Sequence, residues 1–187
     1  VFSRMDRPLL LKLSLDSRPV SEELEQFITD FVALSDKLTM EMIDKQAEES
    51  FAPCVEVCLA DGAPTGLAFH GVPSGHEFTS FVLGLYNAAG PGQALDDATK
   101  EQIASIKEKT DLKILVTLSC TMCPDLVKAA QRIAAENPRI TAEVYDIRHF
   151  EEIKNRFNVM SVPCLVINDE NVSFGKKNIR HILDLLA

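Results

Sequence analysis

The two halves of this 187-residue chain repeat one order of sequence patterns. In the first half, segment 13–20 leads from an apolar run into a Glu-rich helical stretch, and in the second half segment 116–123 leads from an apolar run into a helix through about Glu136. Further on, a proline opens another apolar run in each half, at Pro53 and at Pro163. Strands that alternate with helices in this way are typical of α/β units with a parallel component in the sheet. The repeat therefore predicts two copies of one α/β fold.

The clearest interruption between the halves is the segment 88–93, which reads Ala-Ala-Gly-Pro-Gly-Gln. A cluster of glycine and proline breaks both helices and strands. We therefore expect a first unit over residues 1–92 and a second unit over residues 93–187, each a mixed sheet flanked by helices. A chain of 187 residues is long enough for two small hydrophobic cores.

Hydrophobic periodicity and turn residues predict the elements of each unit. Strands are expected over residues 9–15, 38–43, 54–59, 65–69, 114–118, 140–146, 164–168 and 172–174. Helices are expected over residues 21–33, 76–85, 95–109, 124–135, 150–157 and 179–186. Ser21 is the expected N-cap of the first helix, because serine is a preferred residue at that position.

The second unit carries a C-x-x-C pair, Cys120 and Cys123, between its first apolar run and its helix. Two intervening residues let the sulfur atoms come within bonding distance, and unpaired N–H groups at a helix N-terminus stabilise a thiolate. We expect Cys120 to be the attacking thiol and Cys123 to resolve the mixed disulfide. Ser17 and Val20 occupy the equivalent positions of the first unit, which is therefore expected to be redox-silent.

Two other readings of this pair are a structural disulfide and half of a zinc site. Zinc would need four Cys or His ligands, and the sequence contains no second C-x-x-C and no H-x-x-x-H. Cys54 and Cys58 lie four residues apart in a strand, about 13 Å, which is too far for a disulfide. We expect these two and Cys164 to be core residues. An odd count of scattered cysteines fits a reducing, cytoplasmic location.

Pro163 follows the cysteine pair by about 40 residues and opens an apolar strand, as the cis-proline does in thioredoxin-like folds. A cis bond there would present the backbone of Val162 to a docking thiol or peptide. The alternative is an ordinary proline in an edge strand. Pro53, its counterpart in the first unit, is a second candidate for a cis bond.

Charge and hydropathy exclude two classes of partner. The net charge of −9 argues against nucleic acid, because phosphate binding needs a basic face. No apolar run approaches the roughly 20 residues of a membrane span, so no membrane association is expected.

Five segments together resemble the N-terminal domain of the flavoprotein subunit of bacterial alkyl hydroperoxide reductase, over nearly the whole chain. They are 34–39, Gly75–Ser80 (Gly-His-Glu-Phe-Thr-Ser), 119–125, 137–140 and 158–163. The resemblance implies two fused thioredoxin-like folds, of which the second is redox-active. It also implies a carrier that takes electrons from the dithiol of a flavoprotein reductase domain and reduces the disulfide of a peroxiredoxin.

The resemblance further implies roles for individual residues. Cys120 would attack the peroxiredoxin disulfide, and Glu77, from the silent unit, would be a buried acid that exchanges a proton with Cys123. No G-x-G-x-x-G follows a strand, so FAD and NADH are expected on a C-terminal or separate reductase domain and no cofactor in this chain. The family often has His-Asn between its cysteines, whereas this chain has Thr121–Met122, so the family's thiol pKa and reduction potential do not carry over.

Two other functions fit parts of the same pattern. One is a general protein disulfide oxidoreductase, although such relatives commonly keep C-x-x-C in both halves. The other is a non-enzymatic docking module in which the cysteines are incidental. A peroxiredoxin-reducing carrier accounts for more of the sequence than either.

Overall fold

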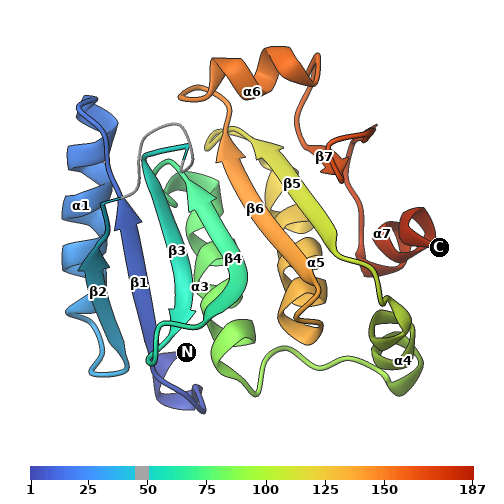
Figure 1. Ribbon diagram of the computed structural model, residues 1–187, viewed down its shortest axis with the longest axis horizontal. Coiled ribbons are helices and arrows are strands. Elements are labelled where there is room, and N and C mark those ends of the chain that lie inside the picture. Colours follow the sequence, from blue (N-terminus) through green and yellow to red (C-terminus); the bar gives the residue numbers. More distant parts are fainter. Residues whose placement is uncertain (45–50) are drawn as a thin grey trace.

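A computed structural model describes residues 1–44 and 51–187. The described strands form one eight-stranded sheet in the order β2-β1-β3-β4-β6-β5-β7-β8 (Figure 1). The strands are Leu9–Ser14 (β1), Leu38–Met42 (β2), Cys54–Leu59 (β3), Pro64–His70 (β4), Thr110–Val116 (β5), Ile140–Asp146 (β6), Cys164–Ile167 (β7) and Asn171–Phe174 (β8). The helices are Pro19–Val32 (α1), Phe78–Ala89 (α3), Asp97–Ser105 (α4), Cys123–Glu136 (α5), Glu151–Arg156 (α6) and Ile179–Leu186 (α7), with 3₁₀ turns at Phe2–Arg4 (η1) and Gly75–Glu77 (η2).

The sheet confirms the repeat that the sequence predicts. In the first unit, β1 pairs in parallel with β2 and antiparallel with β3, and β3 pairs antiparallel with β4. In the second unit, β5, β6, β7 and β8 pair in the same way. Each unit is thus a mixed sheet with the same strand order. We keep residues 92 and 93 as the proposed boundary between the units, because the chain there runs from the end of α3 to the start of α4.

The two units share one sheet, which the sequence did not predict. Edge strand β4 of the first unit pairs in parallel with β6 of the second, from Leu67 opposite Ala142 to His70 opposite Tyr145. This pairing satisfies backbone groups that two separate sheets would each leave unpaired at an edge. Helices α3 and α5 lie next to each other behind this junction (Figure 1). Gly84 lies at this contact, where a Cβ atom would lie 2.6 Å from Oε1 of Gln131 and the Gln131 side chain would have to shift.

Gly66 allows the backbones of the two units to approach closely beside this pairing. Its φ angle is +87°, and a Cβ atom there would lie 2.9 Å from the carbonyl oxygen of Ile140. We predict that Gly66→Ala lowers the free energy of unfolding by about 2 kcal/mol or more, because it adds both backbone strain and a clash. Gly175→Ala is the matched control, since its φ is +91° but a Cβ atom there would have no neighbour within 4 Å. Equal losses for the two variants in urea unfolding would contradict a close approach at Gly66.

Several helix boundaries differ from the predicted ones. α1 begins at Pro19 with Arg18 as its N-cap, and the Ser21 hydroxyl instead donates to Asp16, so the predicted N-cap was wrong. Proline is favoured in the first turn of a helix because its missing N–H needs no partner there. The helix predicted over 95–109 is shorter, since Asp96 accepts from the backbone N–H of Thr99 and β5 starts at residue 110. The helix predicted over 76–85 starts later and ends later, at Phe78–Ala89.

Most buried apolar side chains of the described residues belong to one cluster, and a smaller cluster lies in the second unit. The larger cluster draws on strands and helices of both units, and it includes Leu13, Phe69, Val116 and Cys123. Because this cluster is continuous across the junction, the N-terminus of α5 is held against a rigid scaffold. Within residues 1–44 and 51–187, no helix has both the length and the apolar character needed to cross a bilayer.

Candidate active site

Cys120 and Cys123 form a disulfide at the N-terminus of α5, with their Cα atoms 5.5 Å apart. Cys123 is the first residue of the helix, one position earlier than predicted, and it is fully buried, whereas Cys120 in the preceding loop is partly exposed. The backbone N–H of Cys123 donates to the sulfur of Cys120 over 3.1 Å. An N–H group aimed at this sulfur would stabilise a thiolate at Cys120 after reduction. The geometry therefore suits Cys120 as the accessible sulfur and Cys123 as the shielded one.

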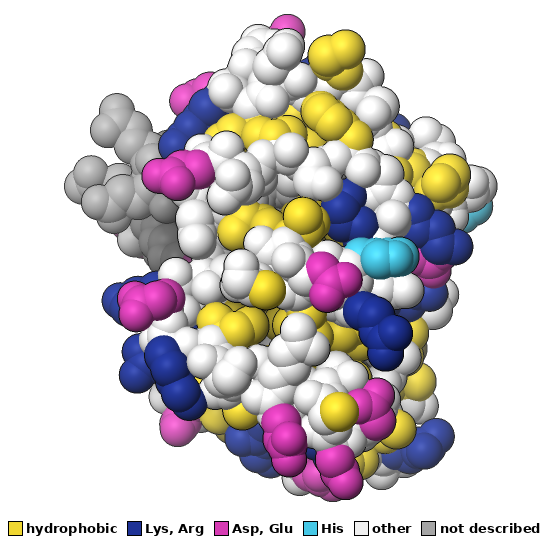
Figure 2. All heavy atoms as spheres, turned by 90° about the vertical axis from the view of Figure 1, so that its right-hand side faces the viewer, with side chains coloured by type: hydrophobic (Ala, Val, Ile, Leu, Met, Phe, Trp, Pro, Cys, Tyr) yellow, Lys and Arg dark blue, Asp and Glu magenta, His cyan; other side chains and the backbone are white. Residues whose placement is uncertain are grey.

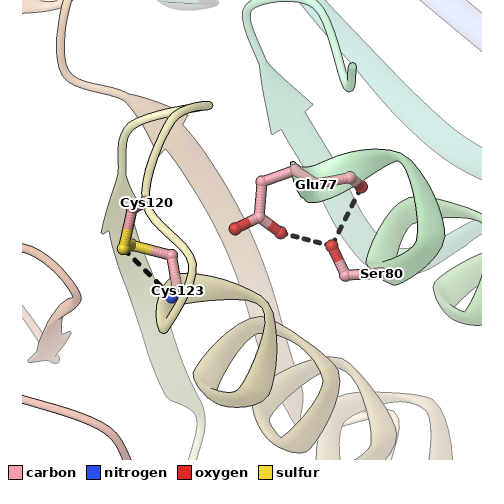
Figure 3. The surroundings of a disulfide bond; sticks show 4 residues. All are labelled: Glu77, Ser80, Cys120 and Cys123. Atoms are coloured by element: carbon pink, nitrogen blue, oxygen red, sulfur yellow. Dashed lines mark hydrogen bonds between the residues drawn. A yellow bond between two sulfur atoms is a disulfide. The ribbon is translucent and has the colours of Figure 1, made fainter. Parts of the chain in front are cut away.

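The first unit brings Glu77 to this disulfide through η2. The backbone N–H of His76 donates to the carbonyl oxygen of Leu118, in the loop that leads to Cys120, over 3.1 Å. Gly75 permits this contact, because its φ is +57° and a Cβ atom there would lie 2.9 Å from the same carbonyl oxygen. Figure 3 shows the Glu77 carboxyl group pointing from η2 toward the sulfur atoms.

The Glu77 carboxyl group is buried and only half satisfied by hydrogen bonds. Its residue exposure is 0%, its Oε2 accepts from the Ser80 hydroxyl, and its Oε1 has no hydrogen-bond partner. Burial raises the pKa of Glu77 from its ordinary 4.5 to about 7, although the Ser80 hydrogen bond and the charge of Lys128 act in the opposite direction. A carboxyl group with such a pKa can hold or release a proton near neutral pH.

Pro163 lies directly before β7, and the Val162–Pro163 peptide bond is cis. The Ala52–Pro53 bond before β3 is also cis, so both units have a cis-proline at the equivalent place, as the sequence predicted. Val162 and Cys120 pack on the rim of the cluster that contains Cys123. The neighbouring side chains of Met160 and Met122 are 81% and 51% exposed, which places two apolar groups at the surface of these loops.

The other three cysteines are buried and lie outside any disulfide, which confirms that Cys54, Cys58 and Cys164 are core residues. Burial raises the pKa of Cys164 to about 11, although Lys177 acts in the opposite direction. In the described parts of the chain, no three His, Cys, Asp or Glu side chains gather in a group that could hold a metal ion.

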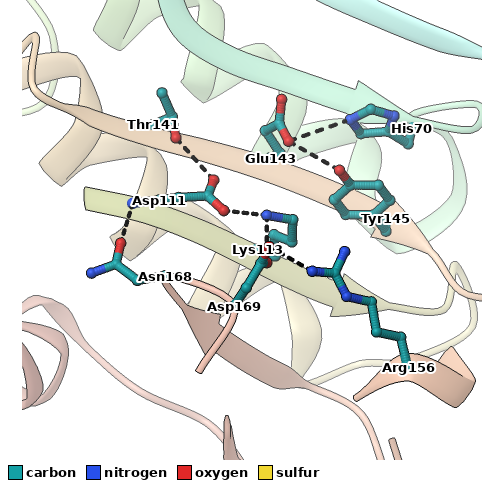
Figure 4. Close-up of polar contacts among 9 residues, drawn as sticks. All are labelled: His70, Asp111, Lys113, Thr141, Glu143, Tyr145, Arg156, Asn168 and Asp169. Atoms are coloured by element: carbon teal, nitrogen blue, oxygen red, sulfur yellow. Dashed lines mark hydrogen bonds and ion pairs between the residues drawn. The ribbon is translucent and has the colours of Figure 1, made fainter. Parts of the chain in front are cut away.

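A second polar cluster, which no sequence pattern singled out, lies at the junction of β4 and β6 (Figure 4). The Nδ1 atom of His70 is hydrogen-bonded to the carbonyl oxygen of Phe51. The Nε2 atom of His70 lies 3.8 Å from both the Cys54 sulfur and Glu143 Oε2. Burial favours the neutral imidazole, but Cys54 and Glu143 outweigh it and raise the pKa of His70 to about 10. Burial would also raise the pKa of Glu143, but the ion pair with His70 outweighs it and the pKa falls to about 2. The pair thus links the two units electrostatically.

A groove of about 440 Å³ lies beside the disulfide helix, between α5, α7 and residues 93–95. Its charged lining is mainly basic and consists of Lys128, Arg132, Lys176, Lys177 and Arg180 together with Asp125. Figure 2 shows the face that carries α7, where hydrophobic side chains alternate with Lys, Arg, Asp and Glu. Neither cysteine of the disulfide and no oxygen of Glu77 lines this groove, so it is separate from the redox site.

Comparisons with known proteins agree with this geometry. Residues 110–184 match the thioredoxin domain family. The N-terminal domain of the alkyl hydroperoxide reductase F subunit from Enterococcus faecalis is 38% identical, with a TM-score of 0.92 over 100% of this chain and 94% of that chain. The alkyl hydroperoxide reductase F subunit of Pseudomonas aeruginosa is 34% identical over 181 residues, which are 96% of this chain and 34% of that protein. A protein of Ferdinandcohnia aciditolerans named NADH dehydrogenase is 30% identical over 183 residues, 98% of this chain and 34% of that protein. The chain thus spans about a third of the length of these curated relatives.

Proposed function

The chain belongs to the family of N-terminal domains of the alkyl hydroperoxide reductase F subunit, and from this premise we propose that it carries electrons from a flavoprotein reductase dithiol to a peroxiredoxin disulfide. It is a thiol–disulfide oxidoreductase domain with a thioredoxin-like fold. The observation that carries the proposal is the Cys120–Cys123 disulfide at the start of α5, beside the buried Glu77 carboxyl group.

In the proposed reaction, reduced Cys120 attacks one sulfur of the peroxiredoxin disulfide as a thiolate. A mixed disulfide forms, and the other peroxiredoxin sulfur leaves with the electron pair of the broken bond. The Cys123 thiol then gives its proton to Glu77 and attacks the Cys120 sulfur, which releases the second peroxiredoxin thiolate. Two electrons have moved to the peroxiredoxin, and this chain holds the disulfide that the structure contains.

Electron supply runs through the same atoms in reverse. A reductase dithiol attacks Cys120, and the leaving Cys123 sulfur takes the proton that Glu77 holds. A pKa of about 7 supports both directions, because Glu77 is then partly ionised and partly protonated near neutral pH. Pro163 and the Val162 backbone are proposed to contact the docked partner, because Val162 is half-buried and packs, like Cys120, against the cluster that contains Cys123.

FAD and NADH are proposed to bind to a reductase domain rather than to these residues. The turns after β1 and after β5, residues 15–18 and 117–122, contain no glycine that would let a pyrophosphate approach a helix N-terminus. We place the protein in a reducing cytosol, because three of its five cysteines lie outside any disulfide.

A side-by-side reduction assay tests the proposal. We expect the reduced chain to transfer electrons to a bacterial two-cysteine peroxiredoxin at least about tenfold faster than to insulin, a preference of about 1.4 kcal/mol or more. Equal rates on both disulfides would indicate a general protein disulfide oxidoreductase. A Cys120–Cys123 pair that stays oxidised in dithiothreitol would indicate a docking module instead.

A further inference from the structure

Ser80 lies one helical turn after Glu77, and both residues have 0% exposure. The Ser80 Oγ atom lies within hydrogen-bonding distance of two Glu77 oxygens, the backbone carbonyl oxygen at 2.9 Å and the carboxyl oxygen Oε2 (Figure 3). A serine hydroxyl has one hydrogen and can donate it to one of these oxygens at a time, while its own oxygen can accept. The hydroxyl therefore cannot donate to both oxygens at once.

The contact between Ser80 and Glu77 has two arrangements, one for each charge state of the carboxyl group. When Glu77 is ionised, Ser80 donates its hydrogen to Oε2. When Oε1 has taken up the proton of Cys123, Oε2 is the carbonyl oxygen of a neutral acid and a weaker acceptor, and the Ser80 hydrogen turns to the Glu77 backbone carbonyl. In both arrangements the Ser80 side chain lies against Oε2, and Oε1 is the carboxyl oxygen without a hydrogen-bond partner in the protein.

Among the described residues, few charged groups compete with Ser80 for influence on Glu77. Lys128, on the facing helix α5, favours the carboxylate through its charge and is itself paired with Asp125 over 3.1 Å. His76, next to Glu77 in η2, is exposed. The disulfide, toward which the carboxyl group points, carries no charge (Figure 3).

We propose that Ser80 is a positioning residue for proton transfer: its hydroxyl donates to Oε2 of the carboxylate, turns to the backbone carbonyl when Oε1 is protonated, and leaves Oε1 to exchange a proton with Cys123. This inference rests on the proposed function, in which Glu77 is the proton acceptor and donor for Cys123. It adds that the direction of the Ser80 hydroxyl follows the charge state of the carboxyl group.

Removing the Ser80 hydroxyl is expected to slow oxidation of the cysteine pair but not its reduction. In Ser80→Ala the carboxylate loses its donor, so the pKa of Glu77 rises above its native value of about 7, by about one pH unit. Less carboxylate is then present at neutral pH, and the step in which Cys123 loses its proton slows several-fold. The reverse step needs protonated Glu77, so reduction of the Cys120–Cys123 disulfide is not slowed.

The test measures the rate of oxidation of the reduced chain and the rate of reduction of the oxidised chain. Both rates are measured from about pH 5 to pH 9, around the pKa of Glu77. Dithionitrobenzoate oxidises the reduced chain, and its second nitrothiolate is released only when Cys123 attacks the Cys120 sulfur. Dithiothreitol reduces the disulfide in the other direction. Thr79→Ala is the matched control, because it removes an exposed hydroxyl one residue away in the same helix.

We expect the midpoint of the second nitrothiolate release to move up by about one pH unit in Ser80→Ala and not in Thr79→Ala. Titration of the Glu77 carboxyl carbon by NMR in the oxidised protein should move by the same amount, whether or not a partner protein is present. An unchanged midpoint and an unchanged titration would overturn the role of Ser80. If Glu77→Gln loses the wild-type midpoint while Ser80→Ala keeps it, Glu77 is supported as the proton partner of Cys123 and only the role of Ser80 is rejected. Failure of the Ser80 inference can therefore be told apart from failure of the proposed function.

Discussion

Cys120→Ser is expected to abolish electron transfer from the reduced chain to a peroxiredoxin, to the background rate of the assay. The serine hydroxyl cannot form a mixed disulfide, and the buried Cys123 sulfur has 0% exposure, so it cannot replace the lost nucleophile. The measurement is NADH consumption coupled to peroxide reduction, with a flavoprotein reductase that can reduce this chain. Retained turnover would reject the assignment of Cys120 as the attacking thiol.

Two companion variants separate loss of the nucleophile from loss of the fold. Cys58→Ala removes a buried thiol in β3 of the first unit and should keep turnover, although it lowers stability by leaving a small cavity. Cys123→Ser keeps the attacking thiol but removes the resolving one, so the mixed disulfide with the peroxiredoxin should accumulate. Mass spectrometry of the non-reduced adduct would show whether Cys120 is the linked residue.

Local sequence signals were sufficient to predict the disulfide between Cys120 and Cys123 and the cis bond before Pro163. The C-x-x-C pair at a strand–helix junction can be recognised from the sequence, because the distance between its two sulfur atoms depends on neighbouring residues only. The repeat of the two halves likewise predicted that both units have the same succession of strands and helices along the chain. The boundaries of α1 were less predictable, because Ser21 fits both an N-cap and the observed contact with Asp16.

Contacts between distant segments were beyond what the sequence could predict. The pairing of β4 with β6 joins edge strands that carry no pattern specific to each other. The partners of His70 come from β3 and β6, so its link to Cys54 and Glu143 exists only in the folded chain. The contact of Ser80 with Glu77 is easier to predict from the sequence than these long-range contacts. Residues three apart in a helix lie on the same face, so a serine three residues after an acid can reach its carboxyl group.

In the proposed reaction the first unit has a chemical role. It lacks a cysteine pair, yet it supplies Glu77 and holds it against the disulfide loop through His76 and Gly75. The carboxyl group is fully buried in the folded chain, and desolvation is the main cause of its raised pKa. Loss of cysteines in one copy of the repeat is therefore compatible with retention of that copy.

Glu77→Gln is expected to slow the step that closes the Cys120–Cys123 disulfide by about 100-fold, the usual contribution of a general base. An amide cannot accept the Cys123 proton, so the rate should also lose the transition near pH 7 that the native carboxyl group gives. Stopped-flow oxidation of the reduced chain at several pH values measures both effects. Glu23→Gln, on the exposed side of α1, is the control for loss of a negative charge.

The same variant should stabilise the fold at alkaline pH. The pKa of Glu77 is about 7 in the folded chain against an ordinary 4.5, so the native state holds the proton more tightly than the unfolded state. The stability that this proton gives is complete below pH 4.5 and is lost as the pH rises through 7, by about 3 kcal/mol. The amide in Glu77→Gln does not ionise, so urea unfolding of the variant should show a gain over wild type at pH 9 that vanishes at pH 5. A constant difference between the two proteins across that range would mean that Glu77 is not a desolvated acid, and its role as the proton partner of Cys123 would fall with it.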